Sequence, residues 1–201
     1  LYNRGEHLLL DPTARSNLEL TETMRGRGKR GTLLWLLDRT QTAMGGRLLR
    51  AWIEEPLTQK EQIERRLDAV EEMMRAFLTT QELIEALSPI YDIERLVTKL
   101  SYLSFNARDA QSLCQSLQMI PKIRKLLAGY TCAALSDIRD RLDPMTDMCG
   151  LLERAIAENP PIPIREGGII RDGYSSELDA LRSAASGGRD WLSQIESTGR
   201  E

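Results

Sequence analysis

Three groups of carboxylates are the first side chains whose types and spacing could carry chemistry. They are the pairs Glu54-Glu55 and Glu71-Glu72 and the series Asp137, Asp140, Asp143 and Asp147. Two carboxylates in a cleft can transfer protons or hold a metal ion. Arg139 and Arg141 are interleaved with the aspartates, however, and no glycine-containing calcium loop surrounds them. We therefore predict that these residues form solvated helix faces.

Nucleophilic and metal chemistry is limited by the residue types present. The chain has a single histidine, His7, so it cannot assemble a Ser-His-Asp triad or a multi-histidine metal site. The cysteines, Cys114, Cys132 and Cys149, form no C-x-x-C pair, which fits a reduced, intracellular protein. Cys114 and Cys149 fall at apolar helical positions, where buried thiols act as small hydrophobes. We therefore predict no catalytic, cofactor-binding or metal site.

Basic residues are concentrated in one glycine-rich segment near the N-terminus. The segment contains Arg25, Arg27, Lys29 and Arg30, interleaved with Gly26, Gly28 and Gly31. A flexible basic loop could contact phosphate, so these four cations are our candidate nucleic-acid contacts. The alternative is a solvated connection, favoured by the net charge of −3 and by the lack of interleaved aromatic residues. A nucleotide phosphate loop is excluded because no Gly-Lys-Ser/Thr ending follows a buried strand.

Helices must position these residues, because apolar side chains recur at steps of three and four from Thr32 onward. Thr58 and Glu61 have the spacing of a capping box, so we expect a long helix to begin there. Its buried face would be Ile63, Leu67, Val70, Met74 and Phe77. Asn106 with Asp109 predicts another helix start, and Pro121 should kink or end the helix that follows. The pattern indicates an all-α, irregular multi-helix bundle.

In the last quarter of the chain the helical spacing of apolar residues is interrupted before a final helix. Residues 162–171 surround a Gly-Gly pair and predict one short β-hairpin. A long C-terminal helix should then run from about Ser176 to Ser197. Its apolar seam includes Leu178, Leu181, Ala185, Leu192 and Ile195, at nearly heptad spacing. Such a seam requires a partner, which could be a second copy of the chain.

Length and composition fit a packed domain. The chain has 201 residues, of which 28% are charged and 41% hydrophobic. It contains no run of 18 apolar residues and no signal-like segment, so we expect no membrane association and a cytoplasmic location. Because it begins at Leu1 and stops at Glu201 without a closing turn, we expect an internal fragment of a longer protein.

Residues 10–20, 31–57 and 92–96 contain motifs that together resemble the core, or lever, domain of MutS-type DNA mismatch repair proteins. Residues 10–20 (LDPTARSNLEL) are similar to the stretch that opens that domain, although Ala14 stands where the family usually has Thr or Ser. Residues 31–57 (GTLLWLLDRTQTAMGGRLLRAWIEEPL) follow the family pattern almost position for position. Similar segments recur at 92–96 (DIERL), 160–161 (PP), 167–170 (GGII) and 173–179 (GYSSELD). The signature positions, which the resemblance implies are structural, are Asp38, Thr42, Gly45, Arg47, Pro56, Asp92, Glu94 and Arg95.

The resemblance carries expectations about organisation and function. It implies an entry segment at 1–20 that ends a connector, a helical core at 21–173, and a long lever helix at 174–201 that leads to a clamp outside this chain. The parent protein would bind mismatched duplex DNA, use ATP and Mg²⁺, and form a homodimer or heterodimer that acts at the nucleoid. This part would couple ATPase state to clamp closure without catalysis of its own. The alternative is a helical protein-interaction scaffold unrelated to DNA repair.

Overall fold

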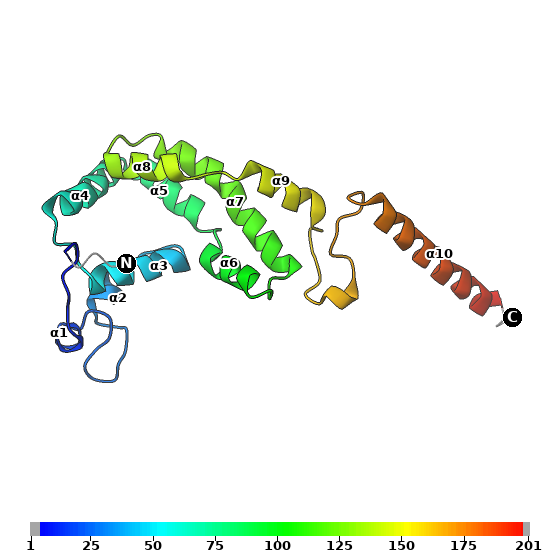
Figure 1. Cartoon of the computed structure of the whole chain (residues 1–201), viewed down its shortest axis with the longest axis horizontal. Helices are drawn as coiled ribbons and strands as arrows, with labels where there is room; N and C mark the ends of the chain where they lie inside the picture. Colours follow the sequence, from blue (N-terminus) through cyan, green and yellow to red (C-terminus); the bar gives the residue numbers. More distant parts are fainter. Residues whose placement is uncertain (1–4, 199–201) are drawn as a thin grey trace. The chain divides into compact units, whose positions relative to one another are not determined.

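The computed structural model describes the backbone of residues 5–198 and the side chains of residues 5–187. Within that range every regular element is a helix, which confirms the all-α prediction (Figure 1). Extended pairing there is limited to two isolated bridges, His7 with Leu57 and Ile156 with Ile170. The helices are α1 (Pro12–Asn17), α2 (Leu33–Leu37), α3 (Ala43–Glu54), α4 (Lys60–Arg75), α5 (Phe77–Leu87), α6 (Ile93–Ser101), α7 (Ala107–Leu127), α8 (Ala133–Arg141), α9 (Thr146–Ala155), the 3₁₀ helix η1 (Ile164–Glu166) and α10 (Ser176–Thr198).

The chain divides into two compact units. The first comprises Leu1–Ser104 and Gln115–Met145, and the second comprises Phe105–Cys114 and Thr146–Glu201. Helix α7 therefore contributes its first turns to the second unit and the remainder to the first.

The larger core of the first unit lies among α4, α5, α7 and α8. Its buried members are Leu83, Ala86, Ile123, Leu127, Tyr130 and Leu135. Tyr130 is only 1% exposed, and its hydroxyl shares a 2.8 Å hydrogen bond with the hydroxyl of Thr80 on α5. A buried hydroxyl needs such a partner, because an unpaired one loses its bonds to water. The tyrosine thus joins the turn after α7 to α5.

A second, smaller core in the same unit holds α2 against α3. It consists of Leu20, Leu34 and Ile53. The Thr32 hydroxyl accepts a 3.1 Å bond from the amide of Trp35 and so caps α2. The α3–α4 connection is tied to the N-terminal segment, since Pro56 O accepts a 2.8 Å bond from the amide of Leu8.

Of the two expected helix starts, one was confirmed and one was wrong. Asn106 and Asp109 form a reciprocal capping box, each accepting the other's amide at 3.0 to 3.1 Å. Thr58, in contrast, does not cap α4, because its hydroxyl donates to Gly5 O and the helix begins one residue after Gln59. Helix α7 does not end at Pro121, which lies inside it. The loss of one N–H is therefore tolerated within this long helix.

The predicted buried face of α4 is also wrong. Ile63, Leu67, Val70, Met74 and Phe77 are between 38% and 75% exposed. The helix instead packs Ala69 and Met73 against the larger core. A neighbouring face of the same helix is therefore used. Ile63, Leu67, Val70 and Met74 form an outward apolar stripe on α4, and Phe77 is the first residue of α5.

The β-hairpin expected near 162–171 is not formed. Its first arm is the 3₁₀ helix η1, and both Gly167 and Gly168 have positive φ angles, of 70° and 71°. Its second arm pairs elsewhere, because Ala157 N donates to Ile169 O and Arg171 N donates to Ala155 O, each at 2.9 Å. The end of α9 and the residues just after it thus pair with Ile169 and Arg171, which the hairpin would have used as its second arm.

The predicted long C-terminal helix is confirmed as α10. Leu178 is half-buried, whereas Leu181 is 64% exposed and Ala185 is exposed. The remaining seam positions, Leu192 and Ile195, lie outside the side chains that the structure describes. Across the described residues, we find no helix with both the length and the apolar character needed to cross a membrane.

A carboxylate from α4 holds the start of α8. Glu72 accepts bonds from the amide and hydroxyl of Thr131, at 2.6 and 2.8 Å, and from the amide of Cys132 at 2.8 Å. Helix α8 has no side-chain cap of its own at Cys132, so Glu72 supplies the missing acceptor. The bonds from the amides of Thr131 and Cys132 lower the pKa of Glu72 to about 2.

Replacing Glu72 by Gln should reduce the loss of folding free energy that occurs as the pH is lowered. A carboxyl whose folded pKa is depressed stabilises the fold fully above its unfolded pKa and loses that contribution as the pH falls through the folded pKa. We expect the free energy of unfolding of the unsubstituted chain to decline between about pH 4.5 and about pH 2, and that of E72Q to decline less. Urea denaturation at each pH measures this.

The matched control is Glu71→Gln, since Glu71 pairs only one turn away with Arg75 on the same helix. If E71Q reduces the loss of unfolding free energy at low pH as much as E72Q does, the assignment to Glu72 is contradicted.

Candidate functional site

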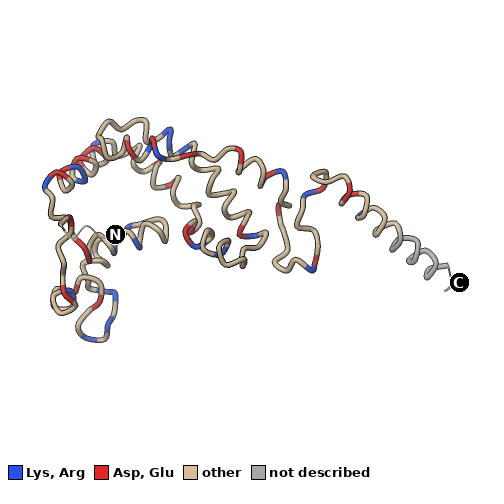
Figure 2. Tube along the Cα trace, viewed as in Figure 1, with Lys and Arg blue, Asp and Glu red and all other residues tan. Residues whose placement is uncertain are grey.

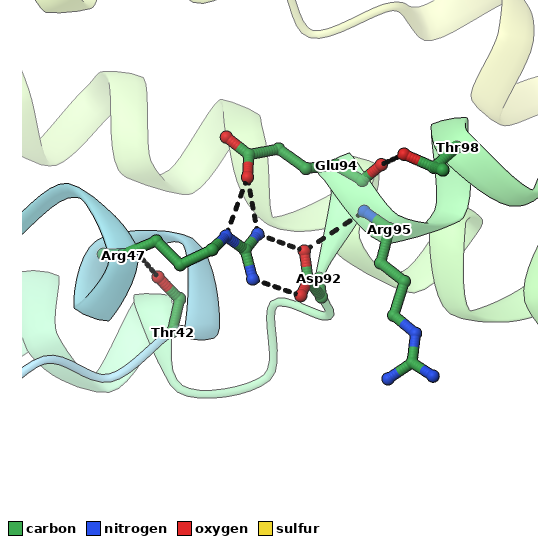
Figure 3. A network of polar contacts seen from close by, with 7 residues as sticks. Thr42, Arg47, Asp92, Glu94, Arg95 and Thr98 are labelled. Atoms are coloured by element: carbon green, nitrogen blue, oxygen red, sulfur yellow. Dashed lines mark hydrogen bonds and ion pairs between the residues drawn. The ribbon is translucent and has the colours of Figure 1, made fainter. Parts of the chain in front are cut away.

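Arg47 forms the most extensive polar contact between distant segments of the first unit. Its Nη1 and Nη2 atoms donate to the two carboxylate oxygens of Asp92 at 2.8 and 2.7 Å (Figure 3). Its Nε and Nη2 atoms donate to Oε2 of Glu94 at 3.1 and 2.5 Å. The guanidinium of Arg47, on α3, therefore bonds to two carboxylates at the start of α6. We call Arg47, Asp92 and Glu94 the arginine junction.

The N-terminal caps of α3 and α6 hold the two helix starts in place around the arginine junction. Thr42 caps α3 by accepting from Gly45 N at 3.0 Å, and Asp92 caps α6 by accepting from Arg95 N at 3.2 Å. A Cβ on Gly45 would stand 3.1 Å from the Thr42 hydroxyl, so glycine leaves room for the cap. The side chain of Arg95 points away from the junction (Figure 3). Arg95 therefore contributes its backbone amide.

The junction keeps its members charged. Hydrogen bonds from Arg47 lower the pKa of Asp92, and the bonds to Asp92 and then to Glu94 raise the pKa of Arg47. Because the guanidinium is planar, its paired N–H groups match the carboxylate of Asp92 in direction as well as in charge. Asp92 is 21% exposed while Arg47 is 50% exposed, so the contact lies at the edge of the fold.

Asp38 organises a second polar contact at the end of α2. Its carboxylate accepts from Lys29 Nζ and from the Thr40 hydroxyl, each at 2.7 Å. These bonds, from Lys29 first and Thr40 second, lower the pKa of Asp38 to about 2. The contact ties the basic loop to the turn between α2 and α3.

The basic loop lies between α1 and α2, where blue segments mark it in Figure 2. Thr23 closes it by donating its amide to Gly28 O at 2.9 Å and by accepting from Gly28 N at 3.0 Å. The candidate contacts Arg25, Arg27, Lys29 and Arg30 are all exposed. Lys29 is held by Asp38, so the three arginines are the loop cations that face solvent without an ion-pair partner among residues 5–187.

An open hollow of about 490 Å³ adjoins this loop. Its charged lining consists of Arg27, Lys29, Arg47 and Arg50 together with Glu22 and Asp38. The excess of cations would suit an anion. Three of the four cations already have carboxylate partners, however, because Arg50 pairs with Glu54 at 2.9 Å in addition to the contacts above. The hollow therefore offers Arg27 as its one cation without an ion pair among the described residues.

Members of each carboxylate cluster that opened the sequence analysis have structural partners. Glu54 pairs with Arg50, Glu72 caps α8, Asp137 pairs with Arg65, and Asp140 pairs with Arg139 at 2.8 Å. In the part of the chain that the structure describes, these carboxylates form no metal-binding group.

One cluster in the second unit was missed by sequence reasoning. Cys114 of α7 lies with Cys149 and Glu153 of α9, and their ligand atoms fall within 4.8 Å of one another. Burial raises the pKa of both thiols, and that of Cys149 reaches about 12 because Cys114 and Glu153 also disfavour its thiolate. Resting thiols of this kind are poor nucleophiles. The only sequence signal was the four-residue spacing of Cys149 and Glu153.

Helices joined by polar contacts at their ends define a helical domain. The chain matches the family described as MutS domain III over residues 13–198, and it belongs to that family. Its relatives include the DNA mismatch repair protein MutS of Halothermothrix orenii (47% identical over 200 residues), of Ruminiclostridium cellulolyticum (48% over 200) and of Geobacillus sp. WCH70 (44% over 201). The resemblance expected from the motifs is confirmed.

These alignments cover all of this chain but a minor part of each relative. The chain spans 22% of the Halothermothrix orenii protein and 23% of the other two.

Replacing Arg47 by Lys should loosen the arginine junction without changing its charge. Lysine offers a point charge in place of a planar fork, so the paired bonds to Asp92 are lost. We expect the thermal midpoint to fall by about 2 °C at low ionic strength and by less in 1 M salt. Calorimetry at both salt concentrations measures this.

Arg75→Lys provides the control, because Arg75 pairs within α4 and joins no second helix. An equal fall in midpoint for R75K would contradict a special role for the junction.

Proposed function

We propose that this chain is the lever of a longer mismatch repair protein, coupling an ATPase to a clamp on DNA. The match to MutS domain III along residues 13–198 and the shared name of its relatives support this proposal. In it, residues 1–20 form the entry from a connector, 21–173 the helical core, and 174–201 the lever helix toward the clamp. The chain would perform no catalysis of its own. Nothing in the comparisons favours a scaffold unrelated to DNA repair.

The arginine junction is the observation that carries the mechanical role. It links α3 to α6, whose contacting residues are 45 and 47 positions apart in sequence, through bonds with fixed direction. Packed helices resist bending, so displacement of one helix moves its bonded neighbour instead of being absorbed in a flexible loop. A junction of this kind is suited to passing movement between elements.

The remaining components belong to the longer protein. It would bind mismatched duplex DNA through other domains, hold ATP and Mg²⁺ in its ATPase, and act as a homodimer or heterodimer at the nucleoid in the cytoplasm. Coupling would operate in both directions, because a nucleotide that alters DNA affinity must itself be bound differently when DNA is present. The exposed Leu181 and Ala185 on α10, together with Leu178, Leu192 and Ile195, are the surface proposed for self-association.

Breaking the junction in the longer protein should reduce coupling more than either binding event. We expect the double variant Asp92→Asn with Glu94→Gln to retain ATP affinity in the absence of DNA, and to lose roughly half or more of the stimulation of ATP turnover by mismatched duplex. Steady-state turnover with and without duplex measures the stimulation.

Asp68→Asn, an exposed carboxylate on α4, is the matched control and should leave the stimulation unchanged. Full stimulation in the junction variant would refute the proposed lever role.

Direct DNA contact by the basic loop is a second candidate, favoured by the exposed Arg25, Arg27 and Arg30. Counterion release makes such binding depend on salt, with a slope of about −0.9 per phosphate contacted. We expect alanine at these three arginines to weaken duplex binding and to reduce that slope by up to about 3. Fluorescence anisotropy across a salt series measures both.

Alanine at the exposed cations Lys122, Lys125 and Arg165 provides the control. The candidate is lost if the unsubstituted chain does not bind duplex at low salt, or if the control set weakens binding equally.

A further inference from the structure

The second unit brings two thiols and a carboxylate to one point. Cys114 on the first turns of α7 is 8% exposed, and its Sγ lies 3.9 Å from Sγ of Cys149 on α9. Sγ of Cys149 lies 3.6 Å from Oε1 of Glu153. Glu153 is exposed, so the cluster reaches from the interior of the unit to its surface.

These separations are those of ligands around one small cation. Zinc binds sulfur at about 2.3 Å and carboxylate oxygen at about 2.0 Å in a tetrahedron. The edges of that tetrahedron are then about 3.8 Å between two sulfurs and about 3.5 Å between sulfur and oxygen. The observed separations of 3.9 and 3.6 Å differ from these edges by about 0.1 Å. The third separation, from Sγ of Cys114 to the carboxylate of Glu153, is no more than 4.8 Å, so a small shift of that carboxylate closes the three ligands on an ion.

The helices also present the ligands in a suitable way. Cys149 and Glu153 are one turn apart on α9, which puts both on one face, as with the paired ligands of helical zinc motifs. Cys114 supplies the third ligand from a separate helix, so an ion would cross-link α7 to α9 inside the second unit.

We propose that Cys114, Cys149 and Glu153 bind a thiophilic divalent metal ion of the zinc class. Thiolate ligands select such ions over magnesium or calcium, which prefer oxygen. On binding, each thiol releases its proton to solvent and each sulfur donates an electron pair to the ion. Water completes the tetrahedron on the exposed side, beside Glu153. The positive charge of Arg171, which favours the Cys114 thiolate, offsets part of the net negative charge of the loaded site.

Cobalt provides a spectroscopic probe of the site. We expect the reduced chain to bind one Co²⁺ with thiolate-to-metal charge-transfer absorption, and Zn²⁺ to displace it. Cys114→Ser and Cys149→Ser should each weaken Zn²⁺ binding about 100-fold or more, and Glu153→Gln about 10-fold, in competition with a chromogenic chelator. Cys132→Ser is the matched control, because Cys132 lies in the first unit, and it should bind as the unsubstituted chain does.

Cysteine alkylation tests the proposal without any substitution, in case a variant fails to fold. Zn²⁺ should slow the alkylation of Cys114 and Cys149, located by peptide mass, and leave Cys132 unchanged. The proposal is overturned if no charge-transfer band forms, if C132S weakens binding as much as the ligand variants do, or if Zn²⁺ protects no cysteine. A disulfide between Cys114 and Cys149 that forms in air and then resists added reductant, with no metal bound, would likewise overturn it.

Discussion

The bond network of Arg47 is the constraint on which the arrangement of the N-terminal helices depends. Without it, Asp92 and Glu94 would place two negative charges beside each other at the start of α6 with no cation between them. The favourable dipole at a helix start offsets only part of such repulsion. The guanidinium therefore allows Asp92 to serve two roles, as the cap of α6 and as the anchor for α3. Removing Arg47 takes the cation from both carboxylates, whereas removing one carboxylate leaves the other paired with the guanidinium.

Similar polar contacts complete other helix ends. Glu72 caps α8 from α4, Asp38 joins the basic loop to the end of α2, and Thr80 satisfies the buried hydroxyl of Tyr130. In each case a side chain from one element satisfies a group on another. These directed bonds add to the packing of the two apolar clusters in holding helix ends together.

Local patterns were sufficient for the helices but not for their partners. The Asn106–Asp109 box was predicted because both members lie within one turn. Thr58 has the same spacing to Glu61, yet its hydroxyl bonds to Gly5, 53 residues away, which no local pattern contains. The β-hairpin failed similarly, since residues 155–157 competed for its second arm. Motif resemblance identified Arg47, Asp92 and Glu94 as structural positions, but their mutual contact and the thiol cluster became visible only in three dimensions.

The outward apolar stripe of α4 has a consequence for how the chain behaves at high concentration. Ile63, Leu67, Val70 and Met74 expose hydrocarbon along several turns of this helix. Contact between such surfaces strengthens on warming and in kosmotropic salts, because both increase the tendency of apolar area to leave water. Solutions of the chain should consequently stay clear longest when they are cold, dilute and low in sulfate.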